Sequence, residues 1–154
     1  MTRFFWDTNL FIYRWSPESD LFHSVKTLQQ RMADNDIALV TSTLVLGELQ
    51  VGPRAAGDLA LAGRYKSILA QLATLVSFDE TAADSYAIIR QTTRAKGPDA
   101  IHLACAATHG VDLFVTNDDK LQGLRIPGIK FIVSIQTALQ LLPELSPSTS
   151  PKAP

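Results

Sequence analysis

Short apolar runs alternate along the chain with longer segments of helical periodicity, and this alternation constrains the fold most. Several runs are apolar throughout rather than at every second residue, which is typical of strands in a parallel sheet covered on both faces. The candidate strands lie at residues 3–6, 37–42, 74–78, 112–116 and 129–133. The predicted fold class is therefore α/β: a three-layer α/β/α sandwich with a mainly parallel central sheet of about five strands.

The segments between these runs carry apolar residues at helical spacing and predict helices at 20–33, 42–51, 59–73, 80–93, 98–110 and 134–142. Ser42 and the Gly97-Pro98 pair are suitable helix starts. We expect one domain over residues 1–142. The remaining residues, 143–154, read PELSPSTSPKAP, and this Pro/Ser-rich composition predicts a disordered tail.

Composition narrows the class of protein. With 154 residues, 46% hydrophobic and 19% charged, the chain can bury a core as a single domain. Its one cysteine, Cys105, rules out an intramolecular disulfide and lies among small residues, so we expect a structural role for it. No segment is long and apolar enough to span a membrane, and Asp7, Asn9 and Arg14 interrupt the apolar N-terminus. These features predict a cytoplasmic protein.

Net charge leaves the partner undecided. The chain has 14 basic and 15 acidic residues and a formal net charge of −1, which by itself argues against a nucleic-acid partner. If four acids were sequestered in a metal site, however, 14 minus 11 would leave +3 on the remaining surface. A nucleic-acid partner is then electrostatically reasonable.

Acidic residues follow two of the predicted strands. Asp7 comes directly after the apolar run FFW, and Asp118 and Asp119 come after LFVTN. In open parallel sheets, ligands bind outside the carboxyl ends of the strands. We therefore expect these carboxylates to share one edge of the sheet.

Two further acids lie on apolar helices. Glu48 stands in the run STLVLGELQVG, where an isolated buried carboxylate would be costly, although it could also occupy a solvent-facing side of that helix. Asp99 opens the helix PDAIHLACAATHG, where an acid suits the helix dipole. Because that helix is apolar nearly all round, it is expected to be buried, with Asp99 pointing into the interior or a cleft.

Clustered carboxylates repel one another and raise one another's pKa, and a divalent cation resolves this conflict. Oxygen ligands without histidine or cysteine favour Mg²⁺ or Mn²⁺ over zinc. Such ions commonly assist phosphoryl chemistry. A metal site made by Asp7, Glu48, Asp99 and an acid of the Asp118–Asp119 pair is therefore the central prediction.

The ordered set of these motifs resembles the PIN domain family and, within it, the VapC-like ribonuclease toxins of bacterial toxin–antitoxin pairs. The matching segments are WDTN, LVLGELQVG, PDAIHLACA and VTNDDKL, which together span essentially the whole domain.

The resemblance implies a metal-dependent endoribonuclease that acts on single-stranded or looped RNA and leaves a 5′-phosphate and a 3′-hydroxyl. It implies that Asp7, Asp99 and Asp118 hold Mg²⁺ or Mn²⁺ and that Glu48 binds metal or water. It also implies a homodimer held inactive by a cognate antitoxin. The small polar residues that would orient the acids are Thr8, Asn9 and Thr116.

Other roles near the acids stay open at this stage. Asp119 could replace its neighbour Asp118 as a ligand, and His102, one turn after Asp99, could face the site or simply pack beside it. Basic residues before the Asp99 helix are candidates for contact with the RNA backbone, although they equally suit a solvated helix end. They are Arg90, Arg94 and Lys96.

Two other functions are compatible with parts of this pattern. A phosphatase of the haloacid dehalogenase type also begins with a strand ending in Asp, but it needs a second Asp where this chain has Asn9. A PIN-like module that binds RNA or protein without cutting is the second alternative, and the presence of all four acids argues against it.

Overall fold

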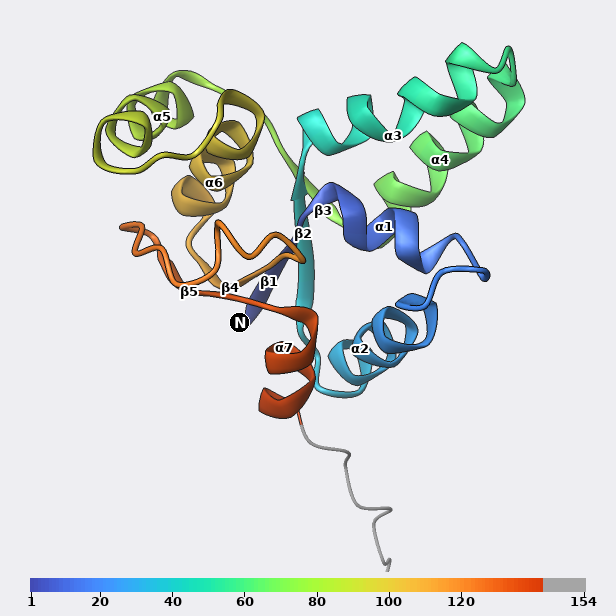
Figure 1. The fold of residues 1–154 in the computed structure, drawn as a ribbon, viewed down its shortest axis with the longest axis horizontal. Coiled ribbons are helices and arrows are strands. Elements are labelled where there is room, and N and C mark those ends of the chain that lie inside the picture. The colour runs from blue at the N-terminus through green and yellow to red at the C-terminus, as the bar shows by residue number, and fades with distance from the viewer. Residues whose placement is uncertain (143–154) are drawn as a thin grey trace, which may run out of the picture.

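A five-stranded sheet forms the middle of the structure, a computed structural model that describes residues 1–142 (Figure 1). Its order is β3-β2-β1-β4-β5, and every neighbouring pair is parallel. The predicted fold class is therefore confirmed, and the predicted tail at 143–154 lies outside the described residues. The strands are β1 (Arg3–Trp6), β2 (Ala38–Ser42), β3 (Thr74–Val76), β4 (Val111–Val115) and β5 (Ile129–Val133).

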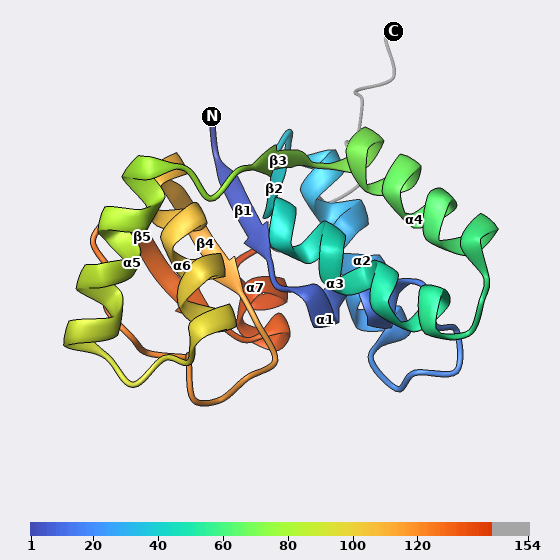
Figure 2. The same cartoon turned by 90° about the horizontal axis from the view of Figure 1, so that it is seen from above.

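Helices cover both faces of the sheet (Figure 2). Helices α5 and α6 lie on one face and the other five lie on the opposite side, where α3 and α4 form a hairpin that reaches away from the sheet (Figure 1). The helices are α1 (Thr8–Arg14), α2 (Phe22–Asp34), α3 (Thr43–Ala55), α4 (Leu59–Leu72), α5 (Glu80–Thr92), α6 (Gly97–His109) and α7 (Ile135–Leu141).

Successive side chains of a strand enter opposite cores, which explains why the strand sequences are apolar throughout. In β1, Phe5 belongs to the core under α5 and α6, whereas Phe4 and Trp6 belong to the core on the other face. Phe5 stacks on Phe114 of β4, with ring centroids 4.8 Å apart. Burying both faces in this way makes a continuous apolar run the favoured strand sequence.

Helix α1 was not predicted. Its sequence, TNLFIYR, is only seven residues long and rich in β-branched and aromatic residues, which have modest helix propensity. Two features compensate: the Asp7 side chain accepts a hydrogen bond from the Thr8 backbone N–H at the helix start, and Leu10 and Phe11 are buried in the core. Tertiary packing therefore overrides local propensity here.

Two expectations about helices, the cap of α3 and the burial of α6, are met. Ser42 caps α3, since its hydroxyl oxygen accepts a hydrogen bond from the Val45 backbone N–H. Helix α6 is largely buried, and Cys105 in it is fully enclosed. No helix of residues 1–142 has the length and apolar character needed to cross a membrane.

Candidate active site

The central strand places the acids at a point where the direction of the chain connections reverses. From β1 the chain moves outward through β2 to β3, whereas β4 and β5 lie on the other side of β1. Crevices at the carboxyl ends of strands form at such switch points. Asp7 follows the carboxyl end of β1, and Asp118 follows the neighbouring end of β4.

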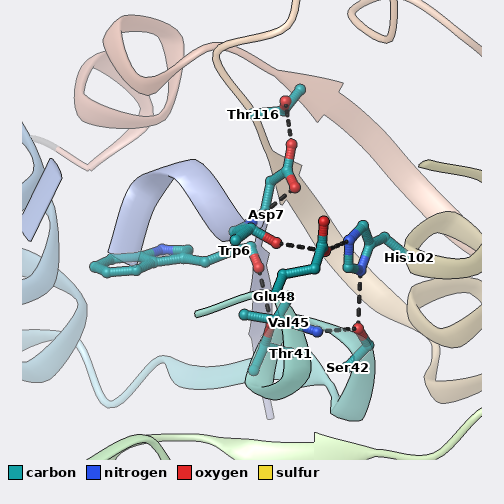
Figure 3. A network of polar contacts seen from close by, with 9 residues as sticks. Trp6, Asp7, Thr41, Ser42, Val45, Glu48, His102 and Thr116 are labelled. Atoms are coloured by element: carbon teal, nitrogen blue, oxygen red, sulfur yellow. Dashed lines mark hydrogen bonds and ion pairs between the residues drawn. The ribbon is translucent and has the colours of Figure 1, made fainter. Parts of the chain in front are cut away.

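Asp7 is fixed by hydrogen bonds from two directions. Its Oδ1 accepts from the Thr8 backbone N–H at 2.7 Å, and its Oδ2 accepts from the Thr116 hydroxyl at 2.9 Å (Figure 3). The side chain is buried, and Thr116 beside it is fully enclosed. Thr8 and Thr116 thus orient this carboxylate, whereas Asn9 is exposed.

Glu48 projects from α3 toward the same edge and joins the Asp7 network through Thr8. The Thr8 hydroxyl donates to Glu48 Oε1 at 2.9 Å, and His102 Nε2 lies 2.6 Å from the same oxygen (Figure 3). The hydrogen bond from His102 lowers the pKa of Glu48 below its usual value, against the opposing effect of burial. The side chain is 37% exposed, so Glu48 neither faces open solvent nor lies in the core.

His102 lies within a polar chain that crosses from α6 to α3. Its Nδ1 lies 2.8 Å from the Ser42 hydroxyl, whose oxygen already accepts from the Val45 N–H. Ser42 can therefore donate its hydroxyl proton to Nδ1, which leaves Nε2 as the N–H that donates to Glu48. These hydrogen bonds favour a packed, supporting role for His102 among the possibilities that the sequence left open.

Asp99 carries the strongest sign of crowding by like charges. Its pKa is raised, first by burial and then by the negative charges of Asp7 and Asp118. Glu48 raises it further, while His102 acts in the opposite direction. Asp7 and Asp99 are 92 residues apart in the sequence, and the fold brings them close enough for the charge of Asp7 to raise the pKa of Asp99.

A cavity of about 600 Å³ opens beside these acids, between the end of α5, the start of α6 and the segment after β4. Asp99 and Asp118 both line it, whereas Asp119 is exposed and outside its lining. Of the basic residues considered from the sequence, Arg94 and Lys96 line the cavity and Arg90 does not; Arg90 donates to the Tyr86 hydroxyl instead.

Sequence reasoning missed several residues of this region. Ser42 was recognised as a helix cap, but nothing in the sequence indicated its contact with a histidine 60 residues away. The lining of the cavity also includes residues that carried no recognisable pattern. They are Thr92, Thr93, Lys120, Leu121 and Leu124.

The donor set fits a hard divalent cation, because the crowded groups are carboxylates whose mutual repulsion such an ion would relieve. In residues 1–142, however, no three histidine, cysteine, aspartate or glutamate side chains stand close enough together to hold one ion. Charge repulsion acts over longer distances than ligand bonds, so the two observations are compatible. The carboxylates of Asp7 and Glu48 are at present turned onto Thr116, Thr8 and His102.

Comparison with known proteins gives a family match. The family model described as "PIN domain" matches residues 4–126. A comparison with curated proteins finds no match.

Solved structures with the same fold include three from bacteria. VapBC2 from Rickettsia felis, bound to a DNA fragment from its promoter, has a TM-score of 0.69 and 20% identity, covering 86% of this chain and 98% of that one. A toxin–antitoxin complex from Klebsiella pneumoniae has a TM-score of 0.60 and 23% identity, covering 81% and 93%. VapBC-5 from Mycobacterium tuberculosis, a member of the VapBC family of toxin–antitoxin systems, has a TM-score of 0.56 and 20% identity, covering 87% and 99%. At these identities the similarity establishes a shared fold.

Proposed function

Since the chain belongs to the PIN domain family, we propose that it is a metal-dependent endoribonuclease that acts as the toxin of a toxin–antitoxin pair. The observation that carries this proposal is the crowding of carboxylates from different elements beside one cavity, where burial first and then the charges of Asp7 and Asp118 raise the pKa of Asp99. Such crowding is costly without a cation, and perturbed pKa values gather at functional sites.

In this proposal Asp7, Asp99 and Asp118 would hold Mg²⁺ or Mn²⁺, and Glu48 would bind the ion or a water molecule. A bound ion of this kind lowers the pKa of water and neutralises charge on a phosphodiester. The overall reaction adds a water oxygen to phosphorus and breaks the bond from phosphorus to the 3′-oxygen. That oxygen takes a proton, so the products are a 3′-hydroxyl and a 5′-phosphate.

The chain's own residues would orient these groups. Thr8 and Thr116 hold the Asp7 carboxylate, and both hydrogen bonds on Glu48 fall on Oε1. Oε2 of Glu48 is therefore left to accept a hydrogen bond from water. Fixing donors and acceptors before the substrate arrives reduces the cost of reorganisation during the reaction.

The partner proposed is an antitoxin protein. The solved neighbours from Klebsiella pneumoniae and Mycobacterium tuberculosis belong to toxin–antitoxin systems, and they share the fold over most of this chain. We extend the same proposal to a homodimer in the cytoplasm. Co-expression with the antitoxin should suppress the activity, and light scattering should give the mass of two chains.

An RNA cleavage assay tests the proposal. We expect wild-type protein with Mn²⁺ to cut single-stranded RNA, and EDTA or the change Asp7→Asn to abolish cutting. Asp84→Asn, at an exposed position on α5, is the matched control and should retain activity. Expression of wild type should slow bacterial growth, and expression of Asp7→Asn should not.

The alternative is a PIN domain that binds RNA without cutting it, and one observation favours it: among the described residues no three candidate ligands are close enough to share an ion. Binding of RNA with no Mn²⁺-dependent cleavage, and equal growth with wild type and Asp7→Asn, would support this alternative.

A further inference from the structure

The cavity beside the acids combines apolar and cationic surface with the carboxylates of Asp99 and Asp118. Leu121 and Ala95 are buried in its wall and Leu124 is half-buried, so part of the lining is apolar. Exposed cationic side chains stand at its border, namely Arg94, Lys96 and Lys120. An apolar recess bordered by cations suits a ligand with a flat apolar part and a negative charge next to it.

The size of the cavity limits what can enter. A volume of about 600 Å³ lies within the range of about 300–1,000 Å³ that is typical of small-molecule sites. A nucleic-acid base fits these dimensions, whereas a duplex does not. A base can enter only if it is unpaired and turned out of its helix, and unstacking costs least in single strands.

We propose that this cavity receives one unpaired base of the RNA, next to the phosphodiester that is cut. The inference rests on the proposed function, because it places the scissile phosphate at Asp99 and Asp118 on the cavity wall. Arg94, Lys96 and Lys120 then contact phosphates of the same strand. The cavity is thus a subsite that selects for an unpaired nucleotide.

Base identity is read only weakly at this subsite. The Thr92 hydroxyl donates to the Ile88 carbonyl and the Thr93 hydroxyl donates to the Ile89 carbonyl, each at 2.8 Å. Thr93 also accepts from the Ala95 N–H at 3.1 Å. Neither hydroxyl has a proton to spare for a base, so neither threonine donates to it, and apolar contact with Leu121 and Leu124 discriminates little between bases.

The first experiment maps the cleaved bond in a single-stranded RNA with Mn²⁺ and then removes one base at a time around it. We expect an abasic nucleotide at one position beside the cut to lower kcat/KM about tenfold or more, because the apolar burial of the base is lost, and replacement by another base there to change it much less. Leu124→Trp, which fills the cavity, should lower kcat/KM on intact RNA and remove the sensitivity to the abasic position.

A second readout is independent of cleavage. RNA with 2-aminopurine at the sensitive position should change fluorescence on binding wild-type protein in EDTA, and this change should be lost in Leu124→Trp. Leu59→Trp is the matched control, because Leu59 is exposed on α4 and outside the lining of the cavity. It should behave as wild type in both assays.

The outcomes separate the inference from the function. If cleavage is insensitive to base removal at every position, or is unchanged in Leu124→Trp, the proposal of a base subsite is refuted. The proposed nuclease function would still stand. Absence of Mn²⁺-dependent cleavage would refute the proposed function, and the subsite with it.

Discussion

The hydrogen-bonded chain from Ser42 through His102 to Glu48 allows a quantitative test of how the site is supported. His102→Leu keeps a side chain of similar size in a position that is 2% exposed. It removes the acceptor of the Ser42 hydroxyl proton, and Ser42 is fully buried. An unsatisfied buried donor costs about 1–3 kcal/mol. Glu48 is 37% exposed and can turn to water, so the loss of its hydrogen bond from His102 adds little to the cost in stability.

We therefore expect His102→Leu to lower the free energy of unfolding by about 2 kcal/mol. Ser42→Ala should cost about 1 kcal/mol for the lost cap of α3 and about as much again for the unpaired His102 Nδ1. The double variant loses the shared hydrogen bond only once. Its destabilisation should therefore fall short of the sum of the single changes by about 1 kcal/mol.

Urea unfolding of the metal-free protein at neutral pH measures this coupling. Ser134→Ala is the matched control, because Ser134 also caps a helix, accepting from the Thr137 N–H at 3.0 Å, but is not bonded to a histidine. When Ser134→Ala is combined with His102→Leu, the two losses in the free energy of unfolding should add. If the Ser42 and His102 changes were also additive to within about 0.5 kcal/mol, the reasoning from the hydrogen-bonded chain would be refuted.

Two further predictions concern single side chains. Asp99→Asn should leave the metal-free protein at least as stable as wild type at neutral pH, because the raised pKa of Asp99 means that its charge opposes folding. The gain in stability of Asp99→Asn over wild type should shrink as the pH falls and wild-type Asp99 takes up a proton. Mn²⁺ should raise the thermal midpoint of wild type only. A large loss of stability in the metal-free variant would mark Asp99 as a structural residue instead. Cys105 is fully buried and burial raises the pKa of its thiol to about 11, so it should react with a thiol reagent only when urea unfolds the protein. Rapid reaction in the native state would contradict this.

The positions of the strands were predictable because the signal of each strand is local. A strand buried on both faces needs an apolar run of a few residues, and each such run is visible without knowledge of its neighbours. Helix α1 was missed because its stability comes from burial of Leu10 and Phe11 and from the Asp7 cap, whereas its composition favours strands. Propensity is a weak guide in a segment so short.

The candidate site was predictable only in part. Strand ends and an apolar helix pointed to the four acids, and the parallel sheet explains why they come near one another. The supporting contacts were hidden, because His102 meets Glu48 across 54 residues and Thr116 meets Asp7 across 109. No periodicity in the sequence encodes such pairings. The cavity was hidden for the same reason, since its lining comes from separate elements.

The central position of β1 in the sheet also determines when the site can exist. The first strand of the chain pairs with β2 early in the sequence, but its other neighbour, β4, begins only at Val111. During synthesis, a ribosome-bound chain has Asp7 and Glu48 long before Asp99 and Asp118 emerge. Pairings between distant segments also form slowly because a long loop must close first. The assembled site is therefore a late product of synthesis, and incomplete N-terminal fragments lack it.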